Sequence, residues 1–191
     1  MLKPSSAFSH IAPPPWLQGL TIEPRESLTM ASFTAARGRV ETLIGTIREA
    51  YGVQPSRGPG RVAAHGISFV WTGPDQWLAI AERENGRDLE RELKPLLAGL
   101  AAVVDQSDGR VVMRVSGPLA REVLAKGIPI DLHARSFGVD AAAVTHASHI
   151  GVVIWQLDDV PTFEMAMFRS YADSFVHWLA DSAQSAASAA V

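Results

Sequence analysis

Six histidines are the first side chains in this sequence that could carry chemistry: His10, His65, His133, His146, His149 and His177. His146 and His149 are three residues apart. We expect both on one strand, where an odd spacing sends them to opposite faces, so we do not expect them to share a metal ion. His133 follows Asp131-Leu132 and could act as a general base, because an imidazole titrates near neutrality. No nucleophile or oxyanion donor stands near it in the sequence, so we favour a hydrogen-bonding role within a loop.

Two groups of acids could form paired-carboxylate sites. Asp158-Asp159 precedes Pro161, and adjacent acids beside a proline are more typical of a solvated hairpin turn. Asp105, Asp108 and Arg110 surround a glycine, and the same interpretation applies to them. We therefore predict that both groups lie in turns.

Nucleotide and nucleophile motifs are also weak. The run Gly58-Pro59-Gly60-Arg61-Val62-Ala63 fits the spacing GxGxxA, but it leads into an expected strand rather than a helix, which is the wrong context for a phosphate-binding turn. No GxxxxGK[ST], GxSxG or HExxH motif is present. The chain has no cysteine, which excludes thiol nucleophiles, disulfides and cysteine-bound zinc or iron–sulfur clusters. We predict no catalytic residue and no metal site, and we assign no cofactor-binding residue.

Four tryptophans stand at positions where strands or helices are expected: Trp71, Trp77, Trp155 and Trp178. We favour core packing for them over a flavin-stacking role. The composition fits a folded domain, with 191 residues, 47% hydrophobic and 19% charged side chains, and a net charge of −3. That balance argues against nucleic-acid binding, which needs an excess of Lys and Arg. With no signal peptide or membrane-spanning apolar run visible, we expect a soluble, cytoplasmic protein.

The elements that must position these residues follow one order twice. The first pass predicts a strand near 26–35, a helix over 38–51, a loop over 54–60, strands over 62–72 and 76–82, and a helix through Leu89, Leu93 and Leu97. The second predicts strands over 102–107 and 110–116, a helix after Gly117-Pro118, strands over 144–157 and 162–168, and a closing helix with Tyr171, Phe175, Trp178 and Leu179 in the core.

This repetition predicts an α+β fold of two ferredoxin-like β-α-β-β-α repeats packed together, because each half alone would expose one face of its sheet. We expect four segments: an irregular, Pro-rich arm over 1–24, a first repeat over 25–101, a second repeat over 102–182 and a flexible tail over 183–191. The arm carries Pro13-Pro14-Pro15 and Trp16, and it either docks on another protein or folds back on its own core.

Several motifs resemble one family. They are Val103-Val104-Asp105-Gln106-Ser107-Asp108-Gly109-Arg110, the run Ser116 to Gly127, Asp131-Leu132-His133, His149-Ile150-Gly151-Val152 with Trp155, Phe163-Glu164, Arg169-Ser170-Tyr171-Ala172-Asp173-Ser174-Phe175 with Trp178-Leu179, and Thr72-Gly73-Pro74-Asp75-Gln76-Trp77-Leu78. In these stretches the chain resembles the gamma subunits of heterotetrameric sarcosine oxidases. The similarity covers about 20–182 and is most specific in the second half.

The resemblance implies a non-catalytic subunit of an enzyme that demethylates sarcosine to glycine, yielding hydrogen peroxide and either formaldehyde or 5,10-methylenetetrahydrofolate. It implies alpha, beta and delta subunits as partners, with alpha in direct contact. FAD, covalent FMN and NAD are then held by the alpha and beta subunits, zinc by delta, and no cofactor by this chain. It also implies a fold like the folate-binding part of the glycine-cleavage T-protein. In the comparable stretch 145–159 only the acidic pair remains of the T-protein's pterin-site pattern, which disfavours folate binding by this chain alone.

Two alternatives stay open. The chain is equally compatible with a subunit of a sister enzyme that acts on another N-methyl amino acid, because substrate contacts would lie on the beta subunit. A stand-alone folate-binding protein is the alternative from a different class. It predicts a folate-responsive monomer, whereas an obligate subunit exposes an apolar surface when it is purified alone.

Overall fold

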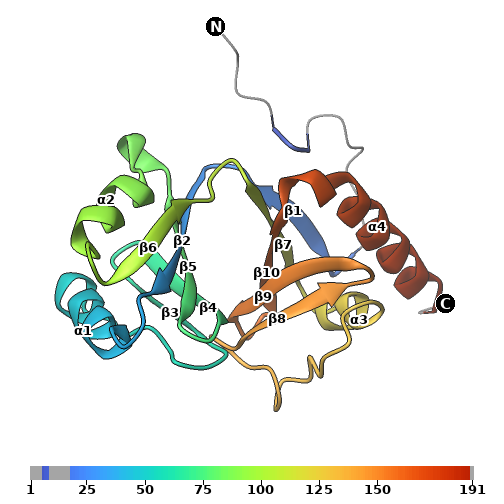
Figure 1. The fold of residues 1–191 in the computed structure, drawn as a ribbon. Helices are drawn as coiled ribbons and strands as arrows, with labels where there is room; N and C mark the ends of the chain where they lie inside the picture. Colours follow the sequence, from blue (N-terminus) through green and yellow to red (C-terminus); the bar gives the residue numbers. More distant parts are fainter. Residues whose placement is uncertain (1–5, 9–17, 190–191) are drawn as a thin grey trace, which may run out of the picture. The chain divides into compact units, whose positions relative to one another are not determined.

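The computed structural model describes residues 6–8 and 18–189 (Figure 1). The Pro-rich run, Trp16 and His10 lie outside this part of the chain. The described residues form two compact units. Unit 1 takes in Met1–Glu26, Arg110–Val139 and Thr145–Val191, and unit 2 takes in Ser27–Gly109 and Asp140–Val144.

Unit 2 is a five-stranded antiparallel sheet with the strand order β3-β4-β5-β2-β6. Its strands are β2 (Leu28–Ala35), β3 (Arg61–Ala64), β4 (Ile67–Gly73), β5 (Gln76–Glu82) and β6 (Ala101–Asp105), and its helices are α1 (Val40–Tyr51), η1 (Glu84–Gly86) and α2 (Leu89–Leu96). Leu43 and Ile47 of α1 and Leu89 and Leu93 of α2 are fully buried. They belong to one core with Phe33, Phe69 and Trp77 of the sheet, so α1 and α2 cover the same face. The apolar periodicity of the sequence thus produces the expected core.

Unit 1 is built around a second five-stranded sheet, in the order β1-β7-β10-β9-β8. The strands of this sheet are β1 (Thr21–Arg25), β7 (Arg110–Ser116), β8 (Ala142–Ala147), β9 (Ile150–Asp158) and β10 (Thr162–Phe168), and residues 142–144 of β8 belong to unit 2. The helices of unit 1 are α3 (Ala120–Ala125), η2 (Arg169–Tyr171) and α4 (Ala172–Ala189). α3 and α4 pack against each other. Phe175 and Leu179 of α4 are fully buried, as predicted, whereas Tyr171 is 46% exposed in η2 and is not a core residue.

The two sheets share one plan, which confirms the α+β fold with β-α-β-β-α repeats. β7, β10, β9 and β8 follow one another in space as β2, β5, β4 and β3 do. The fifth strand of each sheet comes from elsewhere in the chain. β1 precedes β2 in sequence but pairs with β7, and β6 precedes β7 but pairs with β2. In sequence order, the two repeats therefore exchange one edge strand each.

This exchange corrects two of the expected boundaries. The arm over 1–24 is not irregular throughout, because Thr21–Arg25 forms β1 and its backbone pairs with β7. The strand expected to open the repeat over 102–182 is β6, which pairs with β2 in the sheet of the 25–101 repeat. Local periodicity predicts that a strand exists, but its partner is decided by pairing over a long sequence separation.

In two places where the sequence predicted a single strand, the structure has a hairpin of two strands. The strand expected over 62–72 is β3 and β4, joined by His65-Gly66, where both residues have positive φ, 49° and 73°. The strand expected over 144–157 is β8 and β9, joined by Ser148-His149, with Ser148 at φ 54°. Two-residue hairpin turns need such left-handed backbone. Their sequences lack the Asn-Gly or Asp-Gly signal that predicts them.

The segment 183–191, which was expected to be a flexible tail, is helical as far as Ala189, where α4 ends. Ala183 is fully buried and Ala186 is 3% exposed. Alanine has the highest helix propensity of all residues, and its small side chain lets a helix approach its neighbours closely. The Ser- and Ala-rich stretch 182–186 therefore contributes buried side chains to the helix.

Candidate functional site

The most buried charged group among the described residues is Glu164, at the centre of the unit 1 sheet. The strand pairing places Glu164 of β10 opposite Arg114 of β7 on one side and opposite Trp155 of β9 on the other. Arg114 donates to Glu164 Oε1 from Nη2 at 2.7 Å and from Nε at 3.1 Å. Trp155 Nε1 donates to Oε2 at 3.1 Å. Arg25 of β1 also donates to Oε1.

This arrangement, the Glu164 cluster, links four strands through one carboxylate. Both of its oxygens accept hydrogen bonds, three of the donor contacts coming from guanidinium groups, and such charge-assisted bonds are the strong ones. Glu23 of β1 adds a second, half-exposed carboxylate 3.5 Å from Arg114 Nη1. With its oxygens engaged in this way, Glu164 is suited to holding β1, β7, β9 and β10 in register rather than to proton transfer.

Arg121 of α3 makes a second polar centre in unit 1. It donates to the carbonyl oxygens of Leu132 and Phe137 and, at 2.9 Å, to Oε1 of the fully buried Gln156. Its guanidinium also lies over the ring of Phe163, 5.1 Å from the centroid. Arg121 therefore ties α3, the 132–137 loop and the sheet together, which is again a positioning role.

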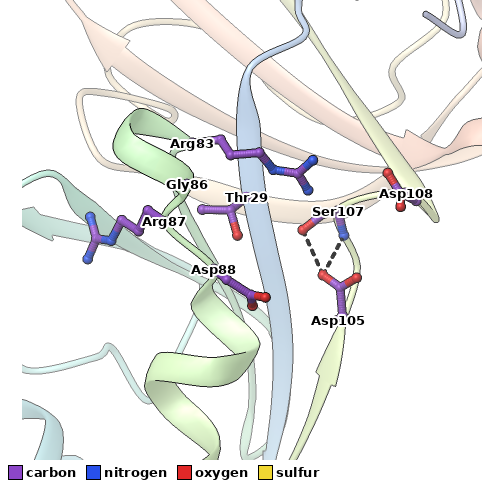
Figure 2. Close-up of a pocket in the computed structure, with 8 residues that line it drawn as sticks. All are labelled: Thr29, Arg83, Gly86, Arg87, Asp88, Asp105, Ser107 and Asp108. Atoms are coloured by element: carbon purple, nitrogen blue, oxygen red, sulfur yellow. Dashed lines mark hydrogen bonds between the residues drawn. The ribbon is translucent and has the colours of Figure 1, made fainter. Parts of the chain in front are cut away.

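The third candidate is a pocket of about 340 Å³ in unit 2 (Figure 2). Every lining residue except Gly86 carries a charge or a hydroxyl: Thr29, Arg83, Arg87, Asp88, Asp105, Ser107 and Asp108. Most of these groups serve the local fold. Asp88 caps α2 by accepting from Arg91 N, Thr29 Oγ1 accepts from Leu89 N, and Ser107 donates to Asp105. Small-molecule sites usually combine an apolar wall with a few polar groups, and this pocket lacks the wall.

Beside that pocket, one charged network joins the two helices of unit 2. Arg87 donates to both oxygens of Glu92 on α2, at 3.0 and 3.1 Å, and to the carbonyl of Gly66. Tyr51, the last residue of α1, donates its hydroxyl to Glu92 at 2.8 Å. The bond from Arg87 holds the pKa of Glu92 below its usual value, and burial together with the Glu92 bond raises the pKa of Tyr51.

These shifts predict opposite pH effects on stability. Folding lowers the pKa of Glu92, so its carboxylate stabilises the folded state at pH values above the pKa that it has in the unfolded chain. This contribution to stability is lost as the pH falls below about 4. Folding raises the pKa of Tyr51, so its protonated hydroxyl stabilises the folded state below about pH 10. This contribution to stability is lost as the pH rises further. We expect Tyr51→Phe to flatten the alkaline loss of stability in urea unfolding.

The predicted histidines are scattered by the fold. His65 and His149 lie in hairpin turns, and His146 lies in β8. The expectation that His146 and His149 share one strand is therefore wrong. His177 on α4 lies 3.4 Å from Asp173. His133 has the loop role predicted for it, because its Nδ1 accepts from Arg135 N while Asp131 accepts from His133 N and Ser136.

The acid groups lie in turns only in part, because Asp108 and Asp159 are turn residues, whereas Asp105 and Asp158 are the last residues of β6 and β9. Asp158 ends β9 and accepts from Val160 N at 3.0 Å, and Asp105 accepts from Ser107 N in the connection from β6 to β7. The glycine-rich run leads into β3, not into a helix. Trp77 and Trp155 are buried core residues, whereas Trp71 and Trp178 are partly exposed.

Sequence reasoning missed Glu164, Arg25 and Gln156 as interacting residues. The one available signal was an acid and an amide within otherwise apolar strands, because a buried polar side chain needs a partner. Within the described ranges there is no group of three or more His, Cys, Asp or Glu side chains that could hold a metal ion. Nor is any helix of that part both long enough and apolar enough to cross a membrane.

Comparisons with known proteins point to one family. The family described as "Sarcosine oxidase, gamma subunit family" matches residues 40–186. The sarcosine oxidase subunit gamma of Arthrobacter sp. is 39% identical over 120 residues, which are 62% of this chain and 58% of that protein. The sarcosine oxidase subunit gamma of Corynebacterium sp. (strain P-1) is 37% identical over 138 residues, which are 71% of this chain and 66% of that protein. The chain thus spans less than two thirds of these curated relatives.

Solved structures agree. A chain of the heterotetrameric sarcosine oxidase from Corynebacterium sp. U-96, in complex with pyrrole 2-carboxylate, superposes with a TM-score of 0.82 and 29% identity, covering 95% of both chains. The glycine cleavage system aminomethyltransferase T from Bartonella henselae has a TM-score of 0.63 and 14% identity, covering 84% of this chain and 45% of that one. The second likeness shows that the expected T-protein fold is present.

Proposed function

Because this chain belongs to the sarcosine oxidase gamma subunit family, we propose that it is the gamma subunit of a heterotetrameric oxidase that demethylates sarcosine. The observation that carries the proposal is the superposition over 95% of both chains on a chain of such an oxidase. The proposed overall reaction converts sarcosine to glycine and yields hydrogen peroxide with formaldehyde, or with 5,10-methylenetetrahydrofolate when folate accepts the one-carbon unit.

The other subunits supply the chemistry in this proposal. FAD, covalent FMN and NAD belong to the alpha and beta subunits and zinc to delta, and the chain itself binds no cofactor and lends no catalytic residue. Support comes from the roles of its polar groups: Glu164, Arg121 and His133 are each engaged in contacts that hold strands or loops. Alpha is the proposed direct partner. The proposed compartment is the cytoplasm, which suits a chain without cysteine.

The proposed task is to form a rigid wall beside the cavity between the flavin and folate sites. Such a cavity protects a reactive imine from water, and a wall must keep its shape to do so. The Glu164 cluster supports this role, because one buried carboxylate holds four strands of the unit 1 sheet in register.

Purification through a tag on this chain, co-expressed with its three partner subunits, tests the proposal. We expect a large complex that shows flavin absorbance and produces peroxide when sarcosine is added. A complex that oxidises another N-methyl amino acid instead would identify a sister enzyme. A colourless particle of one chain's mass that binds folate would overturn the subunit assignment.

A further inference from the structure

The sequence contains a single asparagine, Asn85, and the residue after it is a glycine. The pair lies in η1 (Glu84–Gly86), the short 3-10 helix between β5 and α2 of unit 2. Asparagine is a thermolabile residue, and it loses its side-chain amide most readily before glycine, because glycine has no Cβ to shield its backbone nitrogen. The pair is therefore a place where the chain can change covalently without an enzyme.

Both residues of the pair are open to solvent. Asn85 and Gly86 are exposed, and a Cβ built on Gly86 would meet nothing within 4 Å. Among the residues that the structure describes, no hydrogen bond, ion pair or ring contact holds the side chain of Asn85. Water therefore reaches the side-chain amide, and none of these contacts keeps the amide from turning toward the next peptide nitrogen.

The backbone of the pair is left-handed. Asn85 has φ 52° and ψ 29°, and Gly86 has φ +74°. Left-handed backbone is disfavoured for a residue with a Cβ, and the hydrogen bonds of a 3-10 helix have poorer geometry than those of an α-helix. Exposed turns of this kind open at a small cost in free energy. We therefore expect the turn to allow the rotation about ψ of Asn85 that ring closure requires.

We propose that Asn85 is a site of spontaneous deamidation. The backbone nitrogen of Gly86 attacks Cγ of Asn85 and gives up its proton, the bond from Cγ to Nδ2 breaks, and ammonia leaves. The cyclic imide that results then takes up one molecule of water. Cleavage of the ring bond to Cγ gives aspartate, and cleavage of the ring bond to the backbone carbonyl carbon gives isoaspartate. No electrons are gained or lost in either step.

The two products change unit 2 in different ways. Both add a negative charge two residues from Arg83 and from Arg87, which line the polar pocket (Figure 2). Isoaspartate also adds one methylene to the main chain within the turn. The ends of the turn are held, because Arg83 N donates to the carbonyl of Ser27 at 2.8 Å and Arg87 donates to the carbonyl of Gly66 at 3.0 Å. The longer main chain must fit between these two contacts.

The test follows the fate of residue 85 while the full chain is aged at neutral and at mildly alkaline pH. Trypsin cleaves after arginine, so cuts after Arg83 and Arg87 release the peptide Glu84–Arg87, which contains Asn85. Mass spectrometry measures the fraction of this peptide in which the amide has become an acid. Synthetic peptides with aspartate or isoaspartate at position 85 identify the two products by their retention times. A sample digested before ageing corrects for deamidation during digestion.

We expect both products, formed at a rate that rises with pH, because the attacking backbone nitrogen must lose its proton. The reference is a synthetic peptide of residues 80–90, in which no fold restrains the asparagine. The rate in the folded chain should lie within about tenfold of the rate in this peptide, because an exposed turn opens at a small cost in free energy.

Asn85→Gln is the matched control. It keeps a side-chain amide, but its extra methylene enlarges the ring that must close, so this variant should form no measurable acid at position 85 in the same period. Asn85→Asp carries the charge of one product from the start and should elute with the acidic form of the aged wild type on ion exchange. Asp108-Gly109 is not a source of that acidic form, because cyclisation and hydrolysis of an aspartate leave the charge unchanged.

Two results would overturn the proposal. A rate in the folded chain more than about tenfold below that of the free peptide would mean that the turn protects the amide. Equal acid formation at position 85 in Asn85→Gln would mean that attack by the Gly86 nitrogen is not the route. Neither result depends on partner subunits, so the proposed function stands or fails separately.

Discussion

Replacing Glu164 by alanine is expected to lower the free energy of unfolding by about 3–5 kcal/mol, measured by urea denaturation. The loss would be large because the carboxylate is only 7% exposed and accepts from two guanidinium groups and an indole N–H. Its removal leaves Arg25 and Arg114 partly buried without that charge, and it leaves the N–H of Trp155 unpaired. Removing one partner of a buried ion pair lowers stability by more than the intact pair contributes, because the remaining charge stays buried without its partner.

Glu23→Ala provides the matched control. Glu23 also lies within ion-pair distance of Arg114, at 3.5 Å, but its side chain is 49% exposed. Exposed ion pairs contribute roughly 0–1 kcal/mol, so this variant should stay within about 1 kcal/mol of the wild type. If the two variants lose equal free energy of unfolding, the Glu164 cluster stabilises unit 1 no more than an exposed ion pair does.

A second large effect is expected for Gly117→Ala, with a loss of about 2–4 kcal/mol in the free energy of unfolding. Gly117 follows β7 and has φ +108°, a backbone region that other residues rarely adopt. Its Cβ would lie 2.5 Å from the carbonyl oxygen of Gly19, just before β1. Both atoms of that clash are fixed by backbone, so the strain cannot be relieved by a rotamer change.

The control for this substitution is Gly45→Ala on α1. A Cβ at Gly45 meets nothing within 4 Å, and alanine favours helix over glycine by roughly 0.5–1 kcal/mol. Gly45→Ala should therefore be neutral or slightly stabilising in the same denaturation series. If Gly117→Ala behaves like Gly45→Ala, the close approach of the 117 turn to Gly19 is not a constraint on the fold.

Sequence periodicity predicted the helices and most strands because each of these elements buries a regular stripe. The spacing of Leu43, Ile44 and Ile47 defines α1, and alternation defines β7 and β10. Periodicity did not find the turns at His65-Gly66 and Ser148-His149, because strand-like residues continue on both sides of each turn. A reversal of chain direction leaves the alternation almost unbroken.

The functional residues were predictable only in part. The loop role of His133 follows from local spacing, since Asp131 and Ser136 lie within one turn of it. The Glu164 cluster joins residues from four strands. Arg25 and Glu164 are far apart in sequence, so no local sequence pattern predicts their contact.

The exchange of edge strands affects the order in which the chain can fold as it is synthesised. β1 leaves the ribosome before any of unit 2, yet its pairing partner β7 begins at Arg110. At typical elongation speeds, the residues between them take roughly 4 to 17 seconds to make. During that interval Ser27–Gly109 already contains all five strands of its own sheet. The nascent chain can thus complete the unit 2 sheet while β1 has no pairing partner, and an unpaired edge strand is one that a chaperone or a neighbouring nascent chain can bind.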